Sequence, residues 1–180
     1  MSDIFREVEE DVRRERFEKL WKAYGNYAIA ALVTKRSDIH YPKPKVVSVT
    51  QATELGSVYS PAEIAALTVM AHKAGMKCHM DGARFANALV ATGASPAEMT
   101  WKAGVDLLCF GGTKNGMAVG EAVIFFDRAR AGEFAFRRKR AGHTLSKGRF
   151  LGAQAIAYLD GGHWLAVLLV MGAVIGAFGV

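Results

Sequence analysis

The spacing of hydrophobic positions changes along the chain, and each spacing predicts a different kind of element. In the first 22 residues, apolar side chains such as Ile4, Val8 and Val12 recur every three or four positions among acids and bases. This period predicts a charged amphipathic helix within residues 1–36, which end in an apolar stub. The stub is shorter than the roughly 20 residues that span a bilayer.

From residue 45 onward, short β-branched runs alternate with helical patterns. The predicted strands cover residues 45–50, 76–80, 106–110 and 121–126. The predicted helices begin at Ser60-Pro61, Ala83 and Ser95-Pro96, and two more follow in the basic region and at 149–159. Because strands alternating with helices form parallel sheets, this order predicts an α/β fold with a mostly parallel sheet and flanking helices.

The last 17 residues, WLAVLLVMGAVIGAFGV, carry no charge and predict an apolar C-terminal helix over residues 165–180. The run is close to the length of a bilayer-spanning helix, and Gly172 and Gly176 give it a G-x-x-x-G spacing. Two interpretations stay open at this point: a membrane-spanning helix, which we favour, and a buried helix.

Composition and charge exclude several classes of function. The 180 residues are 51% hydrophobic and 22% charged, which excludes a disordered chain and allows one domain of ordinary size. The net charge of +6 arises within residues 127–149, which contain eight Lys or Arg residues and two acidic residues. Basic helical faces are ordinarily solvated and no further binding module accompanies this one, so we expect no nucleic-acid partner. Cys78 and Cys109 lack disulfide-framework and metal-ligand spacing, so we expect no metal site.

Two predicted strands are each followed by a loop with side chains that can take part in catalysis. Asp81-Gly82-Ala83-Arg84 follows one strand, and Gly111-Gly112-Thr113-Lys114-Asn115-Gly116 follows another. Ligand sites in open α/β sheets form outside the carboxyl ends of the strands. Taken singly, each loop has a simpler interpretation: an Asp81–Arg84 ion pair in a helix's first turn, and a solvated Lys114 in a glycine-rich turn that is not a Walker A loop.

Considered together, the two loops point to pyridoxal phosphate chemistry. A lysine forms a Schiff base with that cofactor, and a carboxylate keeps the pyridine nitrogen protonated so that the ring acts as an electron sink. Lys114 and Asp81 supply these two groups from separate strand ends. His79 shares a strand face with Asp81, but we expect it to be a core histidine.

The segments VVSVTQATELGSVYSPAEI, HMDGARFANAL, TWKAGVDLLCFGGTKNG, EAVIFFD and RRKRAGHTLSKGRFLGAQ carry a family resemblance. Through them, residues 43–164 resemble the low-specificity L-threonine aldolases, in the aromatic amino acid β-eliminating lyase group of the fold-type I pyridoxal phosphate enzymes. The resemblance implies part of an aspartate aminotransferase-like large domain in a cytoplasmic enzyme that is a homo-oligomer when functional. It also implies retro-aldol cleavage of small β-hydroxy-α-amino acids, with threonine giving glycine and acetaldehyde.

The resemblance assigns roles to five residues. Lys114 would carry the Schiff base, and Asp81 would pair with the pyridinium nitrogen. Arg84 would bind the substrate carboxylate or reach the face of the ring. Thr113 would position the lysine or contact the cofactor phosphate. Arg140 is the basic residue expected to approach that phosphate, from the neighbouring subunit if the enzyme assembles.

The resemblance is partial. Family members have a long stretch before the equivalent of Lys43, which supplies a phosphate-cradling loop, and a small C-terminal domain with a carboxylate-binding arginine. We recognise neither pattern here, and therefore expect weak or absent aldolase activity from this chain alone.

An alternative hypothesis comes from the two flanks. Joining residues 27–31 directly to residues 166–180 gives about 20 continuous apolar residues, the length of one transmembrane helix. The composite resembles the N-terminal anchor of bacterial single-pass proteins with a tetratricopeptide-repeat-like domain. Under this hypothesis the chain is a non-catalytic, membrane-anchored protein interrupted by an aldolase segment, and residues 165–180 associate it with the inner membrane.

Overall fold

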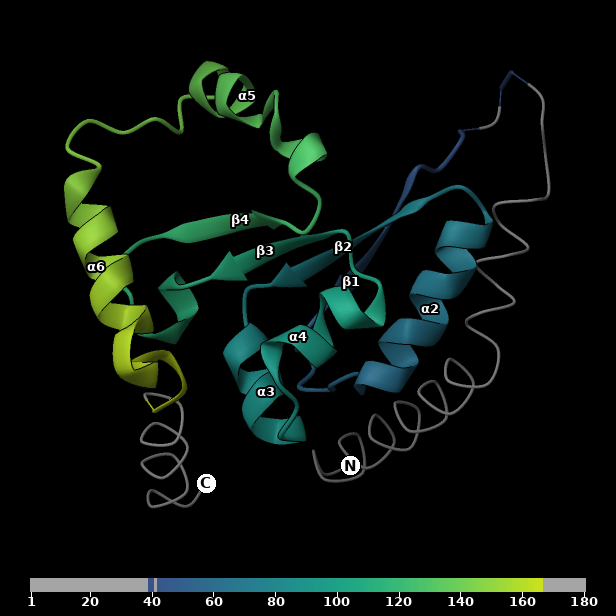
Figure 1. The fold of residues 1–180 in the computed structure, drawn as a ribbon, viewed down its shortest axis with the longest axis horizontal. Helices are drawn as coiled ribbons and strands as arrows, with labels where there is room; N and C mark the ends of the chain where they lie inside the picture. Colours follow the sequence, from purple (N-terminus) through teal and green to yellow (C-terminus); the bar gives the residue numbers. More distant parts are fainter. Residues whose placement is uncertain (1–38, 41, 167–180) are drawn as a thin grey trace, which may run out of the picture.

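The computed structural model describes residues 39–40 and 42–166 (Figure 1). Its strands and helices follow one another in this order: β1 Val46–Thr50, α2 Pro61–Lys73, β2 Lys77–Gly82, α3 Phe85–Thr92, α4 Pro96–Met99, β3 Leu107–Gly111, β4 Glu121–Phe125, α5 Phe134–Arg140 and α6 Arg149–Leu159. Short 3₁₀ turns cover Trp101–Ala103, Thr113–Asn115, Arg128–Ala131 and Asp160–Gly162. The predicted elements between 45 and 159 are therefore confirmed.

Two predicted elements fall outside this description. The amphipathic helix of residues 1–36 lies wholly outside the described residues, and the apolar helix of 165–180 does so apart from its first two residues. Across 39–40 and 42–166, every helix is too short or too polar to cross a bilayer.

The four strands form one mixed sheet in the order β1-β2-β3-β4. β1 pairs with β2 and β2 with β3 in parallel, while β4 runs antiparallel to β3. The sheet is mostly parallel, as predicted. β4 is reversed because only residues 112–120 separate it from β3, and a parallel return needs a crossover of about a dozen residues or more.

Local signals fix where α2 begins and ends. The Ser60 hydroxyl accepts from the Glu63 backbone N–H at 3.3 Å, and the Glu63 carboxylate accepts from the Ser60 N–H at 2.8 Å. Pro61 occupies the first helical position, where its missing N–H has no intrahelical partner to lose. The chain leaves the helix through Gly75, whose φ of +72° suits glycine. These features set the two ends of α2.

The helices give the sheet one apolar and one polar face. Along β2, Cys78, Met80 and Gly82 are buried, whereas Lys77 and His79 point to the other face and are partly exposed. The buried face packs against α2, α3, α4 and α6 (Figure 1). The main core cluster contains Ile64, Met80, Phe85, Leu89, Met99, Ala103, Val105, Leu108, Phe110 and Tyr158.

Candidate active site

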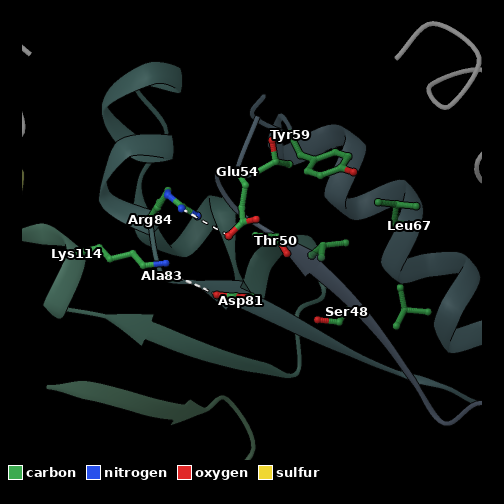
Figure 2. A pocket seen from close by; sticks show the side chains of 12 residues that line it. Ser48, Thr50, Glu54, Tyr59, Leu67, Asp81, Ala83, Arg84 and Lys114 are labelled. Atoms are coloured by element: carbon green, nitrogen blue, oxygen red, sulfur yellow. Dashed lines mark hydrogen bonds and ion pairs between the residues drawn. The ribbon is translucent and has the colours of Figure 1, made fainter. Parts of the chain in front are cut away.

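A cavity of about 620 Å³ opens at the carboxyl ends of β1 and β2 (Figure 2). It is lined by Val47, Ser48, Val49, Thr50, Thr53, Glu54, Tyr59, Leu67, Asp81, Ala83, Arg84 and Lys114. Three of the predicted site residues, Asp81, Arg84 and Lys114, thus line one space although they come from the ends of two separate strands. Its volume is within the range of small-molecule sites.

Asp81 belongs to the last part of β2 rather than to the loop after it. The predicted strand stopped at residue 80, but β2 continues to Gly82, and Asp81 pairs in register with Thr50 and Cys109. One carboxylate oxygen, Oδ1, accepts the backbone N–H of Ala83 at 3.0 Å. A strand position and this hydrogen bond together fix the direction of the carboxylate toward the cavity.

Arg84 does not form the ion pair with Asp81 that the spacing suggested. Its Nη2 lies 3.7 Å from Oε1 of Glu54 instead, and Figure 2 shows this pair across the mouth of the cavity. The i,i+3 geometry requires both residues to be on one helix. Asp81 is still in the strand, and Arg84 is the residue just before the first turn of α3, so the simpler interpretation was wrong.

Lys114 lies on the short turn that follows β3, and its exposed side chain reaches the cavity from that side. The turn approaches the Asp81 loop very closely. A Cβ added to Gly111 would meet the Cα of Ala83 at 2.6 Å. Only glycine allows the two strand ends to come this near, and this contact brings the lysine and the carboxylate to the same cavity.

Thr113 and Arg140 lie outside the lining of the cavity. The Thr113 hydroxyl accepts the backbone N–H of Gly120 at 3.1 Å, so it closes the turn that carries Lys114 against the start of β4. Arg140 is an exposed residue at the end of α5. Within this one chain, the structure therefore brings together three of the five predicted residues.

Sequence reasoning missed Asn115, which anchors the lysine turn. Asn115 is 1% exposed, and its amide nitrogen donates to the Tyr158 hydroxyl and, at 3.0 Å, to the carbonyl oxygen of Trp164. Burial raises the pKa of Tyr158, and the hydrogen bond from Asn115 partly offsets this effect. The residue next to the lysine thus fastens the turn to α6. Its polarity beside a candidate lysine was the only signal in the sequence.

Sequence reasoning also missed the loop that borders the cavity between β1 and α2. Gln51 is fully buried, and its side chain pairs with both backbone groups of Tyr59: Nε2 donates to the carbonyl at 2.7 Å and Oε1 accepts the N–H at 3.0 Å. This clamp closes the loop that carries Glu54, the partner of Arg84. A buried glutamine that holds a loop has no distinctive pattern in the sequence.

The polar face of the sheet carries a chain of three side chains next to the cavity. The Nδ1 of His79 lies 2.7 Å from the Ser48 hydroxyl, and its Nε2 lies 3.2 Å from the Cys109 sulfur. Burial raises the pKa of the Cys109 thiol, and the nearby charges of Asp81 and Glu121 raise it further. The thiol is therefore protonated at neutral pH and is not an activated nucleophile. His79 is only partly buried, with both ring nitrogens partnered.

Comparison with known proteins places these residues in a family context. Residues 19–168 match the family described as Beta-eliminating lyase. The low-specificity L-threonine aldolases of a Pseudomonas species and of Pseudomonas aeruginosa are each 56% identical over 138 residues. These matches cover 77% of this chain and 40% of each relative.

A solved structure of a threonine aldolase also matches the fold of this chain. The threonine aldolase of Leishmania major superimposes with a TM-score of 0.70 at 26% identity, over 78% of this chain and 41% of that one. The chain thus spans about two fifths of the length of the relatives it matches. The resemblance predicted over residues 43–164 is confirmed, and the family match extends beyond it at both ends.

Proposed function

Because the chain belongs to the β-eliminating lyase family, we propose that it carries cofactor- and substrate-binding residues of a pyridoxal phosphate-dependent threonine aldolase. The reaction is retro-aldol cleavage of β-hydroxy-α-amino acids, with threonine giving glycine and acetaldehyde. The observation that supports this proposal most directly is the convergence of Asp81, Arg84 and Lys114 on one cavity.

The residues present fit pyridoxal phosphate, the cofactor of this family. Lys114 offers a primary amine to the cofactor's aldehyde, and Asp81 offers a carboxylate to its ring nitrogen. Arg84 offers a planar guanidinium that suits a carboxylate. The close contact between Gly111 and Ala83 holds the loops of the amine and the acid together. Amine, acid and guanidinium are thus all present around a cavity of suitable size.

When bound, pyridoxal phosphate supplies an electron-withdrawing ring that stabilises the negative charge left at the substrate Cα when the Cα–Cβ bond breaks. The residues of the chain prepare the site for that step. Asp81, oriented by the Ala83 N–H, holds a proton on the ring nitrogen as its anionic partner. Lys114 would hold the cofactor through its side-chain amine, which reaches the same cavity. Asn115 and Thr113 keep the turn of that lysine in place.

The guanidinium group of Arg84 binds the carboxylate of the amino acid substrate. Its partner Glu54 is 79% exposed and 3.7 Å away, so the existing ion pair is weak. A substrate carboxylate accepts two parallel hydrogen bonds from a guanidinium, which is a stronger arrangement. The amino acid therefore displaces Glu54 and fixes its own orientation at the mouth of the cavity.

Covalent labelling tests this proposal without relying on turnover. The full chain is incubated with pyridoxal phosphate, reduced with borohydride and digested, and the modified lysine is identified by mass spectrometry. We expect one predominant adduct on Lys114, absent from Lys114→Ala. Lys102→Arg, at an exposed lysine outside the cavity lining, is the matched control and keeps the adduct. Absence of an adduct, or equal labelling of Lys114→Ala, contradicts the proposal.

Three finer expectations remain proposals. Arg140 contacts the cofactor phosphate across a subunit boundary, which presupposes a homo-oligomer. The aldolase part is cytoplasmic. Membrane association through residues 165–180 belongs to the alternative hypothesis, and the family match to residues 19–168 covers part of the N-terminal segment which that hypothesis assigns to an anchor. Fractionation of cells expressing the chain separates the cytoplasmic from the membrane-associated form.

A further inference from the structure

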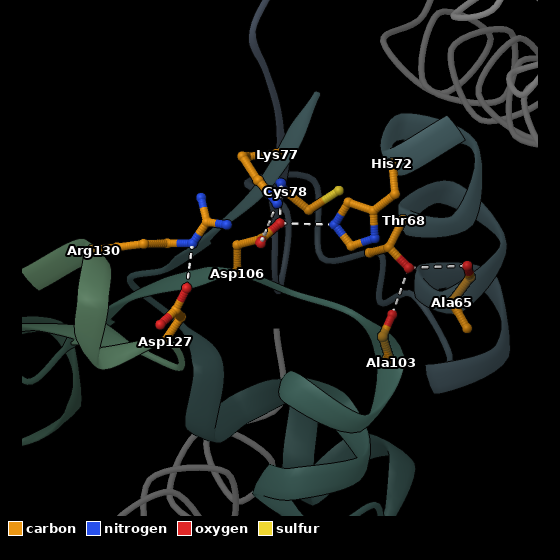
Figure 3. Close-up of polar contacts among 9 residues, drawn as sticks. All are labelled: Ala65, Thr68, His72, Lys77, Cys78, Ala103, Asp106, Asp127 and Arg130. Carbon is orange, nitrogen blue, oxygen red and sulfur yellow. Dashed lines mark hydrogen bonds and ion pairs between the residues drawn. The ribbon is translucent and has the colours of Figure 1, made fainter. Parts of the chain in front are cut away.

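Three side chains with metal-binding atoms converge at the edge of the sheet opposite the cavity (Figure 3). His72 lies in the last turn of α2, Cys78 is the second residue of β2, and Asp106 directly precedes β3. One ligand atom of each lies within 4.8 Å of the other two. We propose that these residues form a binding site for a divalent cation of the zinc type.

The donor set suits zinc in kind and number. Zn²⁺ takes imidazole nitrogen, thiolate sulfur and carboxylate oxygen, often as three protein ligands with water in the fourth position. His72 Nε2 already lies 2.8 Å from Asp106 Oδ2. Figure 3 shows the His72 ring facing the Asp106 carboxylate, with the sulfur of Cys78 beside the ring. Small rotations of the histidine and the carboxylate are enough to place an ion among the three atoms.

Access and support are also present. The His72 side chain is 40% exposed, so an ion enters from the α2 side, whereas Cys78 is buried and forms the floor of the site. The backbone N–H of Cys78 donates to Asp106 Oδ2 at 2.9 Å. Hydrogen bonds of this kind orient a coordinating carboxylate and take up no coordination position of the ion.

Two features oppose binding: an ion pair that competes for Asp106 and a raised pKa of the Cys78 thiol. Lys77 Nζ lies 3.3 Å from Asp106 Oδ1, but its side chain is 45% exposed and can turn into solvent. Burial, and then the charge of Asp106, raise the pKa of the Cys78 thiol to about 11. A bound cation supplies the positive charge that this environment lacks, and a coordinating thiol loses its proton to solvent as the metal–sulfur bond forms.

The sequence concealed this site because its ligands are distant along the chain and include a single cysteine. The expectation of no metal site rested on the spacing of Cys78 and Cys109, which lie on different strands with different neighbours. Only the parallel pairing of β2 with β3, and the packing of α2 across them, bring residues 72, 78 and 106 together.

Cadmium titration tests the proposal on the full chain, with a phosphine reductant present. Cd²⁺ bound by a thiolate gives an ultraviolet charge-transfer band, and the chain has only two cysteines to produce it. We expect a saturable band at one ion per chain, which Zn²⁺ displaces. Cys78→Ser abolishes the band, and Cys109→Ser, the matched control, keeps it.

A second variant, at a metal ligand outside the core, separates loss of the ligand from loss of the fold. His72→Gln changes an exposed position at the end of α2, and we expect at least about tenfold weaker cadmium binding from it. An unsaturable or absent band in the wild-type chain overturns the proposal. So does an unchanged affinity in His72→Gln, or a band lost in Cys109→Ser and kept in Cys78→Ser. If Cys78→Ser is unfolded by circular dichroism, the His72→Gln affinity decides.

Discussion

Replacing Gly111 with alanine should separate the two loops that form the candidate active site. The added Cβ would lie 2.6, 2.9 and 3.0 Å from the Cα, O and C atoms of Ala83. Ordinary carbon contacts are about 3.5–4.0 Å, so one of the two backbone segments must retreat by about 1 Å. Overpacking of this kind costs about 1–3 kcal/mol, and we expect the free energy of unfolding in urea to fall by that amount.

The same retreat should affect the chemistry of the site. Ala83 donates the hydrogen bond that orients Asp81, and Gly111 is the last residue of β3, two positions before the turn that carries Lys114. A misplacement of about 1 Å at a reacting group lowers rates by up to about 100-fold. We therefore expect the rate of borohydride-trapped adduct formation on Lys114 to fall by at least about tenfold, measured at the same pyridoxal phosphate concentration.

A second glycine provides the matched control. Gly152 lies within α6, and a Cβ there would meet nothing within 4 Å. Gly152→Ala should raise the unfolding free energy by up to about 1 kcal/mol through helix propensity and leave the adduct rate unchanged. The reasoning fails if Gly111→Ala unfolds within about 0.5 kcal/mol of the wild type and forms the adduct at the wild-type rate.

Three further predictions follow from the hydrogen bonds and ion pairs. Hydrogen bonds from Ser95 lower the pKa of Glu98, so Ser95→Ala should move that pKa back toward 4.5 in an NMR titration. A carboxyl group with a lowered pKa in the folded state stabilises the fold at pH values above its unfolded-state pKa. The unfolding free energies of the wild type and the variant should therefore converge as pH falls through the wild-type pKa, and parallel curves of stability against pH would contradict this. Asn115→Ala leaves a buried tyrosine hydroxyl without its donor and should lower the unfolding free energy by about 1–3 kcal/mol in a denaturant titration; an unchanged midpoint and slope would show that the anchor is dispensable. Glu54→Gln should release Arg84 and increase its labelling by phenylglyoxal, whereas equal labelling would mean that the ion pair does not shield it.

The sequence predicted those features that depend on neighbouring residues. The capping box of Ser60 and Glu63 located the start of α2, and β-branched runs located the strands. The pairing of an acid with a lysine on separate strand ends also emerged from local pattern, because parallel strands end at the same edge of a sheet. For this reason the sequence alone predicts that Asp81 and Lys114 lie near each other, and both line one cavity.

Features that depend on tertiary packing were not predictable in this way. The partner of Arg84 is Glu54, thirty positions earlier, because the Gln51 clamp folds that loop over the cavity. Asn115 was overlooked because its role depends on α6, more than forty residues away. The place of Asp81 within β2 follows from its pairing with Thr50, which a count of β-branched residues does not reveal.

The position of β4 at the outer edge of the sheet has a consequence for how the protein behaves at high concentration. In the described part of the chain, β1 and β4 are the two outer strands of the sheet. β1 is preceded by Pro42, Lys43, Pro44 and Lys45, residue types that discourage a further strand from joining. β4 has the sequence EAVIF, with Val123 and Ile124 more than a third exposed and a single charge at its first residue. Self-association should therefore begin by strand addition at β4, and a lysine in place of Val123 should suppress it.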